Sequence, residues 1–103
     1  MMPAVWSVDA LDDLDGIVRH IAAENPQAAL NVIGRIESTV SALGHTATGR
    51  PGRVSGTYEK VVAGLPHIIA YATNPRQDGS ECIVILRVIH GARNWPDEDW
   101  PES

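Results

Sequence analysis

The side chains that could act on a phosphate group lie mainly in the second half of the chain. Cleavage of RNA by its own 2′-hydroxyl needs a base, an acid and cations that stabilise the developing charge. If the protein is a nuclease, we expect the catalytic residues to be Lys60, Arg87 and His90. Strand residues three apart face opposite sides of a sheet, so Arg87 and His90 diverge unless a bulge intervenes. The spacing therefore favours a binding protein, for which no catalytic residues are expected.

Positive charge is concentrated in the same half of the chain. Six of the eight Lys and Arg residues fall between positions 50 and 93, although the net charge of the whole chain is −5. Such an asymmetry is typical of a protein with a charged partner. Arginine suits this role because its planar guanidinium binds phosphate or carboxylate through two hydrogen bonds. The side chains expected to bind the target are Arg53, Lys60, Arg87, Arg93 and Trp95.

No metal or cofactor site is expected. The four histidines have no cysteine or carboxylate at the spacing of metal ligands. The segment Gly49-Arg50-Pro51-Gly52 lacks the Lys-Ser/Thr pair of a P-loop and precedes a strand, whereas a P-loop precedes a helix.

The composition is that of one globular domain. The chain has 103 residues, of which 44% are hydrophobic. It contains no apolar run long enough to span a membrane, no signal-peptide pattern and a single cysteine, Cys82. We expect a cytoplasmic protein without membrane contact, with a domain over residues 1–96 and an acidic tail over 97–103.

Hydrophobic periodicity predicts two helices after a short strand over residues 5–8. Asp9 is the expected N-cap of the first helix. Asn25-Pro26 ends that helix and starts the second, which ends at Gly44. Each helix has one apolar stripe, so the two should form an antiparallel hairpin that packs on a further layer.

That layer is predicted to be a sheet. Alternating segments at 57–63, 67–73 and 81–90 are separated by short turns, which favours an antiparallel meander. The last segment is apolar on both faces, with Ile83, Ile85 and Ile89 expected to share one face. The predicted fold is α+β: a short strand and a helical hairpin packed on a small antiparallel sheet of three to four strands.

Several segments together resemble the ParE branch of the RelE/ParE superfamily of toxins. They are Trp6, Asp9–Leu14, Ile21–Ala29, Gly49–Val54, Gly64–Tyr71 and Ile85–Arg93. The resemblance implies a toxin of a type II toxin–antitoxin system that inhibits DNA gyrase. It also implies a hetero-oligomer with a ParD-like antitoxin. We expect the antitoxin to cover the helical hairpin and the sheet through Leu14, Val18, Ile21, Ile33, Ile36 and Arg87.

Two departures from the family pattern bear on function. The chain is acidic where such toxins are usually basic, and Tyr58 replaces a frequent arginine. Both argue against direct nucleic-acid binding without a partner. Two alternatives stay open: a ribosome-dependent mRNA endonuclease on the same scaffold, and a non-toxic protein-binding relative. Arg87, within an apolar strand, needs a carboxylate partner in any of these cases, from the tail or from the antitoxin.

Overall fold

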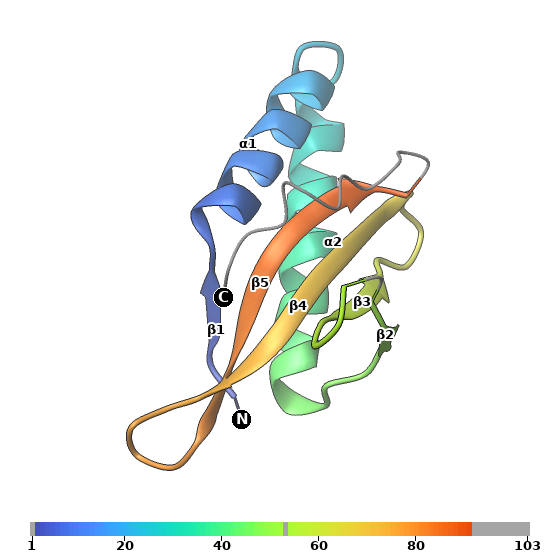
Figure 1. Cartoon of the computed structure of the whole chain (residues 1–103). Helices are drawn as coiled ribbons and strands as arrows, with labels where there is room; N and C mark the ends of the chain where they lie inside the picture. Colours follow the sequence, from blue (N-terminus) through green and yellow to red (C-terminus); the bar gives the residue numbers. More distant parts are fainter. Residues whose placement is uncertain (1, 53, 92–103) are drawn as a thin grey trace.

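The computed structural model describes residues 2–52 and 54–91, which form an α+β fold. Two helices pack on one face of a sheet (Figure 1). No helix within these residues is long and apolar enough to cross a membrane. The elements, in chain order, are β1 (Ala4–Trp6), α1 (Val8–Ala22), α2 (Pro26–His45), β2 (Arg50–Pro51), β3 (Tyr58–Val61), β4 (His67–Pro75) and β5 (Glu81–His90).

The sheet has five strands in the order β1-β5-β4-β3-β2. The predicted meander of β3, β4 and β5 is confirmed, since both pairings are antiparallel. The expectation of a wholly antiparallel sheet of three to four strands was wrong, because β1 pairs with β5 in parallel and β2 adds a fifth strand. A parallel pair needs a long crossover, which the two helices and the intervening strands supply. β2 has only two residues, one of them a proline, and therefore carries no alternating pattern.

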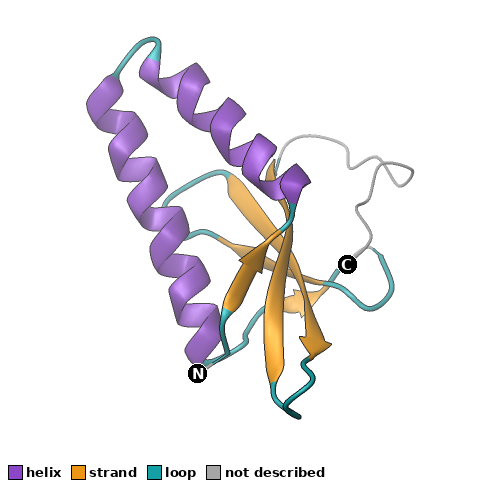
Figure 2. Ribbon diagram, turned by 90° about the vertical axis from the view of Figure 1, so that its left-hand side faces the viewer, coloured by secondary structure: helices purple, strands orange, loops and turns teal. Residues whose placement is uncertain are grey.

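The helical hairpin forms as predicted (Figure 2). The N-cap of α1, however, lies two residues earlier than predicted. Ser7 is the N-cap of α1, and its hydroxyl accepts a hydrogen bond from the backbone N–H of Ala10. Asp9, the predicted cap, instead lies in the first turn, where the helix dipole favours a carboxylate. Asn25 caps α2 and Pro26 occupies its first turn, as predicted.

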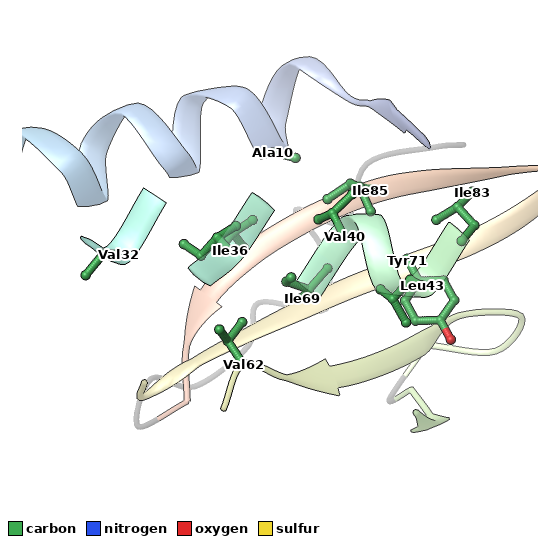
Figure 3. Close-up of a cluster of buried hydrophobic side chains, with 11 residues drawn as sticks. Ala10, Val32, Ile36, Val40, Leu43, Val62, Ile69, Tyr71, Ile83 and Ile85 are labelled. Atoms are coloured by element: carbon green, nitrogen blue, oxygen red, sulfur yellow. The ribbon is translucent and has the colours of Figure 1, made fainter. Parts of the chain in front are cut away.

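The main core lies between α2 and the sheet (Figure 3). Ile36 and Leu43 of α2 are buried there against Ile69 of β4 and Ile85 of β5. Burial of one such side chain stabilises the fold by roughly 1.5–3 kcal/mol. This core holds α2 to the centre of the sheet.

A β-bulge in β5 decides which side chains face this core. Ala70 pairs with Arg87 and Tyr71 pairs with Ile85, so Leu86 is one residue extra. Ile83, Ile85 and, beyond the bulge, Val88 join the core, whereas Ile89 packs with Ile68 and Ala70 in a second cluster. Because side chains alternate along β4, that second cluster lies on the outer face of the sheet, away from α2. The prediction that Ile89 shares a face with Ile83 and Ile85 was wrong, because the bulge reverses the alternation.

Candidate interaction surface

A groove of about 900 Å³ runs between α1 and the last residues of β5. One wall is the α1 segment from Asp12 to Ile21, and the other is Arg87 to His90. The lining also includes Leu65 and Pro66 from the turn between β3 and β4, and His67, the first residue of β4. The lining includes the apolar side chains of Ile17, Ile21, Val32, Leu65, Val88 and Ile89. We call this the α1–β5 groove.

Arg87 and Asp13 join α1 to the edge of β5. Arg87 Nε lies 2.7 Å from Asp13 Oδ2, and Arg87 Nη2 lies 3.0 Å from Asp13 Oδ1. Asp13 Oδ2 also accepts a hydrogen bond of 3.0 Å from the backbone N–H of Val88. The two charged side chains are only 19% and 17% exposed, so the pair is largely shielded from solvent. Such a bidentate pair fixes the relative position of helix and strand.

Ser7 makes a second polar connection next to this pair. Its hydroxyl donates to the carbonyl of Leu86 at 2.9 Å, and its backbone N–H donates to the carbonyl of Ile85 at 2.9 Å. The N-terminus of α1 is thus attached to β5 at the bulge. We call the contacts of Ser7, Asp13 and Arg87 the α1–β5 seam.

Sequence analysis missed Ser7 and Asp13. The carboxylate partner of Arg87 was expected in the tail or in the antitoxin, and not on the first helix. A signal was present, since Asp13 lies three residues after the fully buried Ala10 and four before Ile17, on the apolar side of α1. A carboxylate at such a position predicts a buried cationic partner.

Two histidines of the groove lining, His67 and His90, contact each other edge to face. His67 and His90 are cross-strand neighbours whose ring centroids are 5.7 Å apart. His67 is 6% exposed, and its Nδ1 atom is buried without a hydrogen-bond partner in the described part of the chain. Burial lowers the pKa of His67, and the neighbouring His90 lowers it further. His67 is therefore held in its neutral form at neutral pH.

The three residues expected in a nuclease do not line one site. Arg87 and His90 both line the groove, but His90 is in register with His67 and Arg87 with Ala70, which puts them on opposite faces of the sheet. Lys60 lies on β3, opposite Ile69, and is not part of the groove lining. Arg53, Arg93, Trp95 and the acidic tail lie outside the described residues.

The residues expected to bind an antitoxin differ in exposure. Leu14, Val18, Ile21 and Ile33 are half-buried, and Ile21 lines the α1–β5 groove. Ile36 is fully buried in the main core, so it has no surface with which to contact a partner. Its position on the apolar stripe of α2 points it toward the sheet.

The outer face of the sheet carries a charged pair that sequence analysis did not predict. Arg50 Nη2 lies 3.4 Å from Glu59 Oε1, and Glu59 is only 3% exposed. Arg50, Glu59, Ala70 and Arg87 are successive cross-strand neighbours from β2 to β5. This row therefore places two arginines and a carboxylate on one line across the sheet. Sequence analysis did not predict a strand at Arg50, because β2 has only two residues and shows no alternating pattern.

Three comparisons identify the family of this chain. The family model described as "ParE toxin of type II toxin-antitoxin system, parDE" matches residues 4–95. The chain is similar to "Putative toxin Y4kP" of Sinorhizobium fredii, at 40% identity over 92 residues that cover 88% of this chain and 90% of that protein. It is also similar to a solved structure described as "Chromosomal ParDE TA system from P. aeruginosa", with a TM-score of 0.76 and 28% identity over 87% of this chain and 96% of that one. The match over nearly the whole chain shows that this protein belongs to the ParE toxin family of type II toxin–antitoxin systems.

Proposed function

We propose that this ParE-family protein inhibits DNA gyrase by binding and that a cognate ParD-like antitoxin neutralises it in a hetero-oligomer. The family match supports the toxin role. The observation that favours binding over catalysis is the position of the candidate catalytic groups. Arg87 is engaged by Asp13, and Lys60 lies outside the groove that contains His90. General acid–base catalysis requires these groups within hydrogen-bond reach of one reacting centre.

The charged residues of the sheet are our candidates for the target-binding surface. Arg50 on β2 lies on the outer face of the sheet with Glu59, whereas Lys60 on β3 is in register with the core residue Ile69 and lies on the opposite face. Either face could contribute to target binding, and Arg53, Arg93 and Trp95 remain candidates from the sequence. Arg87 mainly positions α1 relative to β5, because Asp13 accepts hydrogen bonds from two of the three guanidinium nitrogens of Arg87. We place this activity in the cytoplasm, where gyrase acts on the chromosome.

Induction of the protein without its antitoxin tests the proposal. We expect growth arrest, a strong DNA-damage response and loss of supercoiling by gyrase in vitro, while ribosome-bound mRNA stays intact. Substitution of Lys60 by Ala should weaken the arrest, because the mutated surface would bind the target less tightly. The same induction with the antitoxin present is the control.

Two other outcomes would contradict this proposal and each support a different function. Cleavage of ribosome-bound mRNA, lost in a folded His90→Ala variant, would identify an endonuclease. Normal growth and unchanged gyrase activity would identify a non-toxic protein-binding relative.

A further inference from the structure

The outer face of the sheet is buried near the end of β5, although both helices lie on the other face (Figure 2). Ile68 of β4 and Ile89 of β5 belong to the outer cluster and are only 8% and 7% exposed. Val61 of β3 lies on the same face, in register with Ile68, and is 55% exposed. Neighbouring strands cover the flanks of a side chain but not its outer end. Because no described helix or strand lies over this face, Ile68 and Ile89 need another cover.

Two small residues extend this buried surface along β4. Ala70 and Ala72 follow Ile68 on the outer face and are 0% and 6% exposed. Alanine is depleted in strands, where larger side chains pack better against their neighbours. Two successive alanines keep the face low, so a large ring can lie close to the backbone of β4.

The described chain ends against this surface. The backbone N–H of Gly91 donates a hydrogen bond of 2.7 Å to the carbonyl of Pro66. A Cβ atom at Gly91 would lie 3.3 Å from Cδ1 of Ile68. Residues 92–103, which we call the C-terminal segment, therefore start beside the outer cluster. Fully extended, twelve residues reach about 40 Å, which is enough to cross five strands spaced about 4.8 Å apart.

The outer face has three successive kinds of surface along β4. The row nearest Gly91 is apolar and contains Ile68 and Ile89. The next row crosses the sheet through Ala70 and contains the charged side chains of Arg50 and Arg87. Beyond it, Ala72 and its neighbour in β5 are apolar again. The order, from Gly91 outward, is apolar, charged and apolar.

The C-terminal segment repeats this order. Trp95 comes first, the acidic run Asp97-Glu98-Asp99 follows, and Trp100 comes next. A Trp side chain buries on the order of 200 Å² of surface, so each can cover one apolar part of the face. The carboxylates between them complement the arginines of the middle row.

We propose that the C-terminal segment folds back over the outer face of its own sheet. Trp95 packs on Ile68 and Ile89, the acidic run lies beside the row that contains Arg50, and Trp100 packs near Ala72. This inference goes beyond the proposed function, and it assigns Trp95 to the fold and not to the target. An acidic partner that binds the outer face has to displace this segment first.

Paramagnetic spin labels test where the segment lies. Val5 is on the outer face, opposite Val84, and is 52% exposed, so Val5→Cys in a Cys82→Ser background carries a label there. We expect this label to abolish the backbone NMR signals of residues 98–103. The matched control is a label at Ser41→Cys in the same background, at an exposed site of α2, which should leave these signals intact. Intact signals with both labels would overturn the proposal and leave the face to another partner.

Variants within the segment test the contacts that hold it. Trp100→Ala should restore the signals of residues 98–103 in the protein labelled at position 5, because it removes an apolar anchor. Asp97→Asn combined with Asp99→Asn should restore them in part at low salt, where exposed charges are least screened. Glu102→Gln, outside the acidic run, is the control and should change little. Unchanged signals in the Trp100→Ala variant would overturn the assigned contacts.

A mixed sample distinguishes the chain's own segment from that of a second copy. Labelled protein without ¹⁵N is mixed with unlabelled ¹⁵N protein, so that any lost signal reports a contact between molecules. We expect no loss in the mixture. Loss of the signals of residues 98–103 there would show that the segment covers a second copy, which overturns the proposal. None of these measurements depends on gyrase or on an antitoxin, so failure of the proposed function would leave their result unchanged.

Discussion

The two helices are held to the sheet by different means. α2 lies over the main core, where apolar side chains such as Ile36 and Leu43 are fully buried. α1 shares part of that core through Ala10, but it meets β5 through the α1–β5 seam of Ser7, Asp13 and Arg87. Apolar packing tolerates small shifts of a helix, whereas hydrogen bonds require defined distances and angles. The seam therefore sets the position of α1, and with it the width of the groove.

The largest effect is expected from a cavity in the main core. Ile36→Ala should lower the free energy of unfolding by about 2–5 kcal/mol, because Ile36 is fully buried between α2 and the sheet. Urea unfolding followed by circular dichroism measures this loss. Ile36→Val is the matched control, with an expected loss of about 0.5–1.5 kcal/mol. Equal losses for the two variants would show that the core is not closely packed at this site.

The next effect tests the charged part of the seam. Asp13→Ala removes the carboxylate that accepts hydrogen bonds from Arg87 and from the backbone N–H of Val88, so we expect a loss of about 2–4 kcal/mol. A double-mutant cycle with Arg87→Ala should give a coupling free energy of about 1–3 kcal/mol. The same cycle between Asp15 and Arg19, an exposed pair, should give less than about 0.5 kcal/mol. A coupling near zero for Asp13 and Arg87 would remove the distinction between the seam and an ordinary surface pair.

A smaller effect is expected at the other seam residue. Ser7→Ala removes the N-cap of α1 and the hydrogen bond to the Leu86 carbonyl, with an expected loss of about 1–2 kcal/mol. Ser41→Ala, at an exposed site within α2, should change stability by less than about 0.5 kcal/mol. Hydrogen exchange should also become faster in the first turns of α1 in Ser7→Ala and stay unchanged in α2. Faster exchange in both helices would show that Ser7 stabilises the fold as a whole rather than the seam.

The smallest effect is the pH dependence of stability that His67, in the lining of the groove, should cause. The pKa of His67 is lowered from 6.5 by burial and by His90, so the unfolded chain binds more protons than the folded protein below pH 6.5. The contribution of His67 to stability is therefore nearly constant well above pH 6.5 and falls as the pH drops toward the folded-state pKa, by at most about 1.4 kcal/mol per pH unit. Thermal unfolding of the wild type and of His67→Gln between pH 7.5 and 5.5 measures the difference. An identical pH dependence in the two proteins would contradict this account.

The apolar layer was largely predictable from the sequence, and the seam was not. Helix periodicity located α1 and α2, and alternation located the three long strands, since burial of apolar surface is what creates both patterns. The parallel pairing of β1 was not predictable, because three residues carry no information on their partner. The bulge at Leu86 was not predictable for a different reason: a strand that is apolar on both faces gives no sign of a reversal.

The candidate site depended on these unpredicted features. Arg87 and His90 were identified from residue type, but their neighbours Asp13 and His67 come from distant parts of the chain. The bulge in β5 sets the faces on which Arg87 and His90 lie. Local sequence patterns cannot report contacts between residues 74 positions apart. The family resemblance predicted the role of a toxin, whereas the contacts of Arg87 and His90 became known only from the structure.

Because of the bulge, Arg87 also helps to select the correct register between β4 and β5 during folding. If β5 paired without the bulge, the alternation beyond Leu86 would be reversed and Arg87 would point beneath the helices. A guanidinium buried in the apolar core would be strongly unfavourable, whereas most other residues of this strand are apolar and would tolerate either face. The single charge near the end of β5 therefore penalises the misregistered sheet. Arg87 thus disfavours a shifted register of β5 against β4, independently of any partner that the protein binds.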